Sequence, residues 1–155
     1  MGAADILVIT ETHESPARPL PGVTGFQWLS ICRDEVRVSG GVQGSSGVAC
    51  LIKDDIFSNT SIVHSDTFAR FMWVRIDRKG HRQRDLYLAA CYFPPASSHY
   101  AIHATDDGDP YIDLCDTISQ FAILGDIILL GDFNARTQML QTPYMIAALI
   151  PYVPL

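Results

Sequence analysis

The stretch that most constrains the fold is a short apolar run that ends in a polar hexapeptide. Ile127–Leu130 is entirely aliphatic, and residues 131–136 read Gly-Asp-Phe-Asn-Ala-Arg. A continuous apolar run bounded by glycine is typical of a strand covered on both faces, as in layered α/β domains. The run therefore predicts a buried strand with a carboxylate, Asp132, and an amide, Asn134, at its end. Because strand residues two apart point to the same side, we expect these two side chains to face together.

Two further strands are predicted to end in polar groups. The run Ile6–Ile9 leads to Glu11, and the run Leu86–Tyr92 is stopped by Pro94, since proline has no N–H to donate to a sheet ladder. Carboxylate, amide and phenol groups gathered at one sheet edge can hold a divalent cation and orient a water molecule against a phosphorus centre. The pattern predicts phosphodiester chemistry.

Four segments, in this order along the chain, resemble the endonuclease/exonuclease/phosphatase family, which includes the abasic-site endonucleases and the pancreatic-type deoxyribonucleases. They are residues 9–12 (Ile-Thr-Glu-Thr), 47–52 (Gly-Val-Ala-Cys-Leu-Ile), 91–94 (Cys-Tyr-Phe-Pro) and 129–134 (Leu-Leu-Gly-Asp-Phe-Asn). The resemblance runs from Asp5 to Arg136. Within the family, residues 11–13 and 131–136 look most like the endonuclease domains of non-LTR (LINE-type) retroelements.

The resemblance implies a fold and a set of roles. The fold would be a four-layer α/β sandwich, DNase-like, with two stacked β-sheets flanked by helices. Glu11 would be a ligand to Mg²⁺ or Mn²⁺, and Asp132 would position and deprotonate the attacking water. Asn134 would support the phosphate, metal or water by hydrogen bonds, and the Tyr92 hydroxyl would bind a phosphate oxygen. DNA is the substrate that the resemblance favours.

Each of these residues also has an ordinary structural explanation. A glutamate at the end of a strand is usually a solvated charge. Asp-x-Asn after a strand is common turn chemistry. A tyrosine at a strand end is often buried with its hydroxyl in water. The residues alone leave these alternatives open, and the order of the four segments favours the functional ones.

The chain also departs from the family pattern at both ends. The family's first strand, with an active-site asparagine, is expected before Asp5, and a further Asp and an Asp-His pair are expected near the C-terminus, yet no histidine follows His103. We therefore expect residues 1–142 to be a partial domain, incomplete in its fold, followed by an apolar tail at 143–155, with weak or absent activity. The alternatives are a non-catalytic remnant or interaction domain, and a phosphatase of inositol lipids or small phosphoesters.

The net charge of −6 weighs against tight non-specific binding to nucleic acid, which depends on Lys and Arg contacts to phosphates. A bound divalent cation would offset part of this charge. The charge slightly favours the phosphatase branch of the family, whereas the sequence Gly131–Arg136 favours the retroelement branch.

Four cysteines are widely spaced, without a Cys-x-x-Cys pair or zinc-ligand spacing; they are Cys32, Cys50, Cys91 and Cys115. Cys50 and Cys91 are expected to be small buried hydrophobes. The cysteines favour an intracellular protein of the nucleus or cytoplasm. The run Ile6–Ile9 is too short for a signal peptide, so secretion is not expected. The apolar segment 144–151 is shorter than the roughly 18 residues of a membrane span, so no membrane association is expected. The sequence leaves the oligomeric state open.

Four more strands are predicted at Phe26–Ile31, Val36–Val38, Val48–Ile52 and Phe68–Ile76. The glycine-rich residues 40–47 lack the ending of a phosphate-binding P-loop, so we expect a flexible turn between strands. Residues 78–84 are rich in Arg and Lys. A solvated hairpin tip is the favoured interpretation there, and contact with the DNA backbone is the lesser one.

One helix is predicted after Asp109, which suits an N-cap, with Pro110 at the first helical position. Its apolar stripe comprises Tyr111, Leu114, Cys115, Ile118 and Phe121, spaced to pack against a sheet. The histidines, among them His64, have no matching partner in the sequence and are expected to be exposed.

Overall fold

The computed structural model describes residues 4–14, 18–32, 36–38, 41–43, 47–79, 83–95 and 109–134. Arg136, His81, His99 and His103 lie outside the described residues, and so does the expected apolar tail at 143–155.

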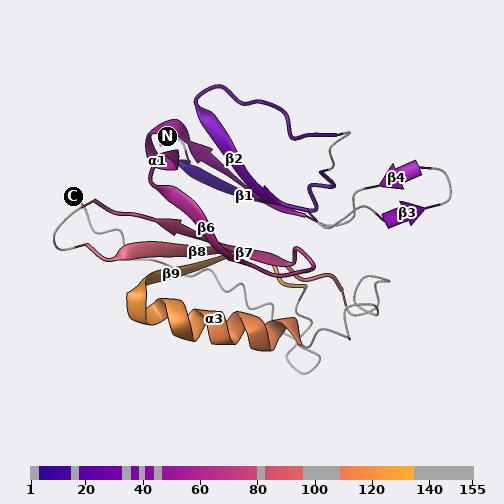
Figure 1. Cartoon of the computed structure of the whole chain (residues 1–155). Coiled ribbons are helices and arrows are strands. Elements are labelled where there is room, and N and C mark those ends of the chain that lie inside the picture. Colours follow the sequence, from indigo (N-terminus) through magenta and orange to yellow (C-terminus); the bar gives the residue numbers. More distant parts are fainter. Residues whose placement is uncertain are drawn as a thin grey trace, which may run out of the picture.

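Two β-sheets are stacked face to face (Figure 1). The first has three antiparallel strands in the order β1-β5-β2, formed by Ile6–Thr10, Val48–Lys53 and Phe26–Ile31. The second has four strands in the order β6-β7-β8-β9, formed by Thr60–Ser65, Phe71–Ile76, Asp85–Tyr92 and Gly125–Asp132. The pairs β6–β7 and β7–β8 are antiparallel, whereas β8 and β9 are parallel.

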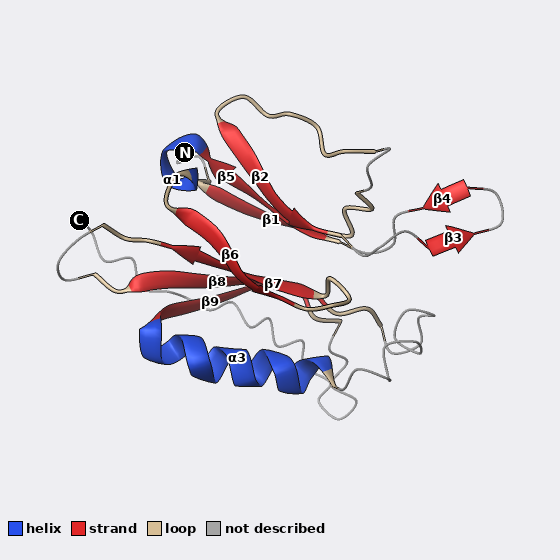
Figure 2. Ribbon diagram, in the orientation of Figure 1, coloured by secondary structure: helices blue, strands red, loops and turns tan. Residues whose placement is uncertain are grey.

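A 15-residue helix, α3 (Pro110–Leu124), covers the outer face of the four-stranded sheet and feeds directly into β9 (Figure 2). A short helix, α1 (Asp54–Phe57), lies between β5 and β6 in sequence. A small antiparallel hairpin is formed by β3 (Val36–Val38) and β4 (Gly41–Gln43). The prediction of an incomplete α/β sandwich with two stacked sheets is therefore confirmed.

Strand β8 is buried on both of its faces and joins two apolar clusters. Alternate residues Leu88, Ala90 and Tyr92 face the three-stranded sheet, where they pack with Cys50 and Met72 among others. The residues between them face α3. This second cluster consists of Phe71, Trp73, Tyr87, Ala89, Cys91, Phe93 and Leu114. The near-continuous apolar sequence of β8 follows from this double burial.

Helix α3 begins as the sequence predicted. The Asp109 side chain accepts a hydrogen bond of 2.9 Å from the backbone N–H of Tyr111, and Pro110 occupies the first turn. The predicted stripe is wrong at Cys115, which is exposed, and Tyr111 is 45% exposed, although its ring stacks on Phe93. Leu114, in the buried cluster, and Cys115 are adjacent on the helix, and successive residues are rotated by about 100° around its axis.

The prediction of a buried strand at Ile127–Leu130 is wrong: β9 lies at the edge of its sheet, its first three apolar residues are only partly buried, and Leu130 is 42% exposed. The apolar run of β1 is likewise not covered on both faces. Leu7 is 45% exposed and Ile9 is 39% exposed. Strand β1 lies at the edge of its sheet, and no helix among the described residues packs over the outer face of that strand. Only alternate residues of β1 are therefore directed into the sandwich.

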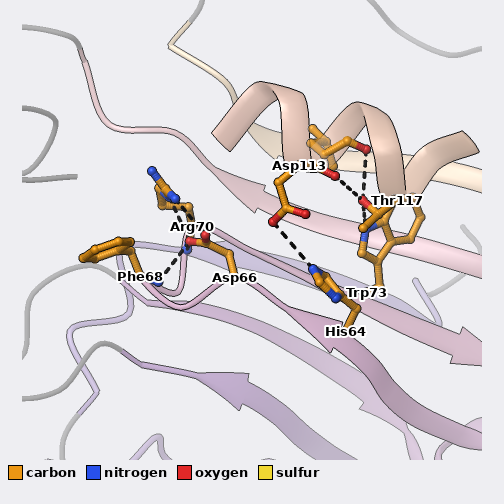
Figure 3. A network of polar contacts seen from close by, with 8 residues as sticks. His64, Asp66, Phe68, Arg70, Trp73, Asp113 and Thr117 are labelled. Carbon is orange, nitrogen blue, oxygen red and sulfur yellow. Dashed lines mark hydrogen bonds and ion pairs between the residues drawn. The ribbon is translucent and has the colours of Figure 1, made fainter. Parts of the chain in front are cut away.

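Three smaller features of the structure differ from what the sequence predicted. The glycine-rich stretch contains a strand, β4, paired with β3. Strand β6 was not predicted, because its sequence is mostly polar and its position depends on pairing with β7. His64 is not without a partner: its Nε2 lies 3.7 Å from a carboxylate oxygen of Asp113 (Figure 3). Its ring also stacks on Phe71.

The indole N–H of Trp73 links β7 to α3 and allows the packing of the helix on the sheet to be tested. It donates a buried hydrogen bond of 2.9 Å to Oγ1 of Thr117. We expect Thr117→Val to lower the free energy of unfolding by about 1–3 kcal/mol, because the indole N–H is left without an acceptor. Ser119→Ala is the matched control, since its hydroxyl also bonds a carbonyl within the helix but is exposed. Equal urea midpoints for the two variants would contradict this assignment.

Candidate active site

Three strands bring their polar ends to one rim of the sandwich. Tyr92 and Asp132 are paired in register as the last residues of parallel strands β8 and β9. The hydroxyl of Tyr92 donates a hydrogen bond to the carboxylate of Glu11, which follows β1. A surface groove between β1 and β9 is bordered by Thr10 and Asp132. Residues 11, 92 and 132, far apart in the sequence, thus lie around a common rim.

Glu11 lies in a loop with an unusual backbone. Glu11 and His13 both adopt left-handed conformations, with φ of 54° and 48°, and between them the N–H of Thr12 donates to the carbonyl of Gly47. Non-glycine residues rarely adopt this conformation, and such residues cluster at functional sites. This loop holds the exposed Glu11 side chain beside Tyr92. If the chain continued as an extended strand, it would run past Tyr92.

The sequence left open whether Tyr92 is a packing residue at a strand end or a residue of the site, and the two ends of its side chain have different surroundings. Its side chain belongs to the core between the sheets, and its hydroxyl ends at Glu11. Its backbone N–H donates to the carbonyl of Arg70 over 2.6 Å. The tyrosine is therefore fixed at both ends and orients the Glu11 carboxylate.

Asp132 and Asn134 are related by a turn, and the expectation that strand geometry aligns them is wrong. Strand β9 ends at Asp132, and Asn134 has a left-handed backbone with φ of 41°. The Asn134 N–H donates to Oδ1 of Asp132 over 2.9 Å, while the Asn134 side-chain amide donates to the carbonyl of Phe93 over 3.0 Å. Asparagine suits this position because it tolerates the left-handed region. The turn keeps both side chains next to the end of β8.

Gly131 is required by the close approach of β9 to β8. Its φ is 141°, and a Cβ atom at this position would overlap the carbonyl of Cys91. Any side chain here would push the two parallel strands apart just before Tyr92 and Asp132. The glycine of the hexapeptide therefore serves the geometry of the rim.

The thiols near the site are not nucleophiles. Burial raises the pKa of Cys50 and of Cys91 to about 12. Both thiols are protonated at neutral pH, and a protonated thiol is a poor nucleophile. The prediction that these two cysteines are small buried hydrophobes is confirmed.

The described residues of the basic joint between β7 and β8 lie at the opposite end of the sheet. Arg78 pairs with Asp126 over 2.9 Å, and Arg75 pairs with Asp85 over 2.7 Å. Asp126 and Asp132 lie near the two ends of β9, about 20 Å apart at the usual rise per residue. The hairpin is confirmed, and its basic residues in the described part of the chain are remote from the rim.

The described residues offer few ligands for a hard divalent cation. They contain no group of three or more His, Cys, Asp or Glu side chains placed to hold a metal. Mg²⁺, however, is commonly bound by one or two carboxylates, with water and substrate phosphates as the other ligands. Glu11, exposed at the rim and oriented by Tyr92, offers such a carboxylate.

The turn that precedes β7 also reaches the rim, and sequence reasoning missed it. Asp66 and Arg70 form a buried ion pair there (Figure 3), and Arg70 is the residue whose carbonyl accepts the N–H of Tyr92. The available signal was an acidic and a basic residue four apart, at the start of the strand predicted over Phe68–Ile76. The structure begins this strand, β7, only at Phe71, and Arg70 belongs to the turn. Burial, which gives the pair its significance, is not visible in that spacing.

A two-sheet α/β sandwich with carboxylate, phenol and amide groups at its strand ends defines a class of phosphoester hydrolases. A family model described as the Endonuclease/Exonuclease/phosphatase family matches residues 2–144. The chain belongs to this family, whose members hydrolyse phosphodiesters and other phosphate esters, generally with a divalent metal, and often act on nucleic acids. Comparison with curated proteins finds no match. No helix in the described ranges is long and apolar enough to cross a membrane.

Gly131→Ala tests the geometry of the rim. We expect it to destabilise the fold by roughly 2–4 kcal/mol, because it adds an overlap with Cys91 to an unfavourable backbone conformation. Gly25→Ala separates the two effects, since Gly25 also has a positive φ of 82° but has open space around it, and should cost about 1 kcal/mol. Chemical denaturation measures both. A smaller loss for Gly131→Ala than for Gly25→Ala would contradict the close approach.

Proposed function

We propose that this chain is a divalent-metal-dependent phosphodiesterase, and that its substrate is DNA, cleaved as by a retroelement endonuclease. The observation that supports the proposal is the meeting of three strand ends, where Tyr92 bonds Glu11 and lies in register with Asp132. The family supports hydrolysis at phosphorus. The sequence from Gly131 to Arg136 supports the retroelement branch.

In this proposal Glu11 holds Mg²⁺ or Mn²⁺. The cation, when bound, polarises a phosphate oxygen and stabilises the leaving group. Asp132 accepts a proton from the attacking water, and Asn134, fixed beside it by the turn, helps to orient that water or the phosphate. When the water and the phosphate are held in line, the reacting groups need no reorientation, and the barrier to attack is lower.

We propose a narrower role for Tyr92 than the resemblance implies. A phenol has one proton to donate, and here it is donated to Glu11. Tyr92 therefore orients the carboxylate. A hydrogen bond from Tyr92 to a phosphate oxygen requires the hydroxyl to turn away from Glu11.

A phosphatase acting on inositol lipids or small phosphoesters is the second candidate within the family. The net charge of −6 favours it, because an acidic surface repels long polyanions more than small ones. Phosphate release from inositol phosphates, compared with nicking of DNA under the same conditions, separates the two. An intracellular location is part of the proposal and is supported by the buried thiols of Cys50 and Cys91, which form no disulfide.

The first test is nicking of supercoiled DNA in Mg²⁺ by the unaltered chain and by Asp132→Ala. We expect a loss of roughly 100-fold or more, the usual contribution of a general base. Asp126→Ala, at the other end of the same strand, is the matched control and should keep full activity. Equal rates for the unaltered chain and Asp132→Ala would refute the assignment. The weak or absent activity expected from the sequence stays a prediction, and this assay measures it.

The second test is binding of Mn²⁺, followed by calorimetry. We expect Glu11→Gln to weaken binding by at least about tenfold, because an amide is a poorer ligand than a carboxylate for a hard cation. Asp5→Asn is the control, since Asp5 precedes the same strand and pairs with Lys53 at its other end. Unchanged Mn²⁺ affinity in Glu11→Gln would rule out this ligand. Metal binding without turnover would favour the non-catalytic remnant.

A further inference from the structure

The turn from Asp66 to Arg70 is held rigidly around one carboxylate. Oδ2 of Asp66 accepts hydrogen bonds from the backbone N–H groups of Phe68 and Arg70, over 3.1 and 3.0 Å. The same oxygen accepts from Nε of Arg70, and Oδ1 accepts from Nη2, each over 2.8 Å. Ala69 completes the turn in a left-handed conformation, with φ of 54°. The position of the Arg70 side chain is therefore fixed before any ligand binds.

Part of the Arg70 guanidinium is left without a partner. The side chains of Arg70 and Asp66 are only 7% and 5% exposed. Nε and Nη2 are bonded to Asp66, but Nη1 is buried and has no hydrogen-bond partner. The ring of Phe68 lies beside the guanidinium, 5.0 Å from its central carbon (Figure 3). A buried donor without an acceptor is unfavourable, so an acceptor supplied by a ligand would relieve that cost.

Arg70 belongs to the same rim as the candidate active site. Phe71, Cys91 and Gly131 lie in one row across β7, β8 and β9. The next row places Arg70 beside Tyr92, whose N–H it accepts, and Tyr92 beside Asp132. Neighbouring strands are about 4.8 Å apart, so the backbone of Arg70 lies about 10 Å from that of Asp132. This distance is within the span of a phosphodiester backbone.

The other described Lys and Arg side chains that form ion pairs lie away from the row of Arg70, Tyr92 and Asp132. Lys53 pairs with Asp5 and Asp55, and Arg75 and Arg78 pair with Asp85 and Asp126. Asp85 and Asp126 lie at the starts of β8 and β9, whereas Tyr92 and Asp132 end these strands. Of the ion-paired cations in the described ranges, Arg70 is the one in the row of Tyr92 and Asp132.

We infer that Arg70 binds a phosphate group of the substrate, donating from Nη1 to a phosphate oxygen while Asp66 holds Nε and Nη2. The inference rests on the proposed function for the identity of the ligand as a phosphodiester. Arginine suits this role because its planar fork can serve a carboxylate on one edge and a phosphate on another. Since Nη1 is covered in the free chain, binding requires a side chain over it to move.

The test measures binding of a short DNA duplex in EDTA, so that no cleavage occurs, by fluorescence anisotropy at several salt concentrations. We expect Arg70→Gln to bind roughly tenfold more weakly, and its salt dependence to fall by about 0.9 in log–log slope, the value for one lost phosphate contact. Arg75→Gln is the matched control, because Arg75 lies in β7 and is also ion-paired, and it should bind as the unaltered chain does.

Two results would overturn the inference. One is a folded Arg70→Gln variant with unchanged affinity and salt slope, and the other is the absence of any binding by the unaltered chain. If Arg70→Gln does not fold, nitrogen NMR of the unaltered chain replaces it. Titration with dimethyl phosphate should then shift the Arg70 guanidinium signal and leave that of Arg75 unchanged, and no shift at saturation would also overturn it.

The nicking assay keeps this inference separate from the proposed function. Nicking that depends on Asp132, together with DNA binding that is indifferent to Arg70, would overturn the inference alone. Phosphate binding that depends on Arg70, without nicking that depends on Asp132, would overturn the proposed hydrolysis and retain Arg70 as a phosphate-binding residue.

Discussion

The parallel pairing of β8 with β9 is the interaction on which the rim depends. It sets Tyr92 beside Asp132 and lets the N–H of Phe93 donate to the carbonyl of Asp132 over 2.8 Å. A parallel pair needs a crossover between its strands, and α3 provides part of it while covering the outer face of the sheet. The absence of a side chain at Gly131 permits the close approach at the end of the pair. Helix α3 and Gly131 thus both help to place the polar ends of β8 and β9 next to each other.

The second constraint is the packing of the two sheets, which brings Glu11 to the same rim. Tyr92 lies in the core between the sheets, and its hydroxyl crosses to the loop after β1. A shift of one sheet relative to the other would break this hydrogen bond. The left-handed backbone at Glu11 and His13 shows that the loop is shaped to keep the glutamate there. Site geometry and core packing are therefore coupled through one tyrosine.

The sequence was sufficient for the parts of the fold that depend on local pattern. Apolar runs located β1, β8 and β9, and the Asp109-Pro110 pair located the start of α3. Features that depend on tertiary contacts were missed or mistaken. His64 gained a partner in Asp113 only because β6 packs near α3, and β1 stayed half-exposed because it lies at a sheet edge.

The candidate site shows the same division. The sequence named Glu11, Tyr92, Asp132 and Asn134, because the family's motifs are local. It could not show that a turn, and not strand geometry, relates Asp132 to Asn134. The spacing of Asp66 and Arg70 did not single out Arg70 either, because its significance comes from burial and from one unpaired nitrogen. Local motifs therefore identified candidate residues, and the structure was needed to relate them to one another.

The most direct measurement of the central claim is the position of Mn²⁺ in crystals of the protein, determined from its anomalous scattering. The account predicts a peak at coordination distance, about 2.0–2.3 Å, from the Glu11 carboxylate, on the side of the groove that Asp132 borders. A peak bound elsewhere, with none at Glu11 under saturating Mn²⁺, would contradict it.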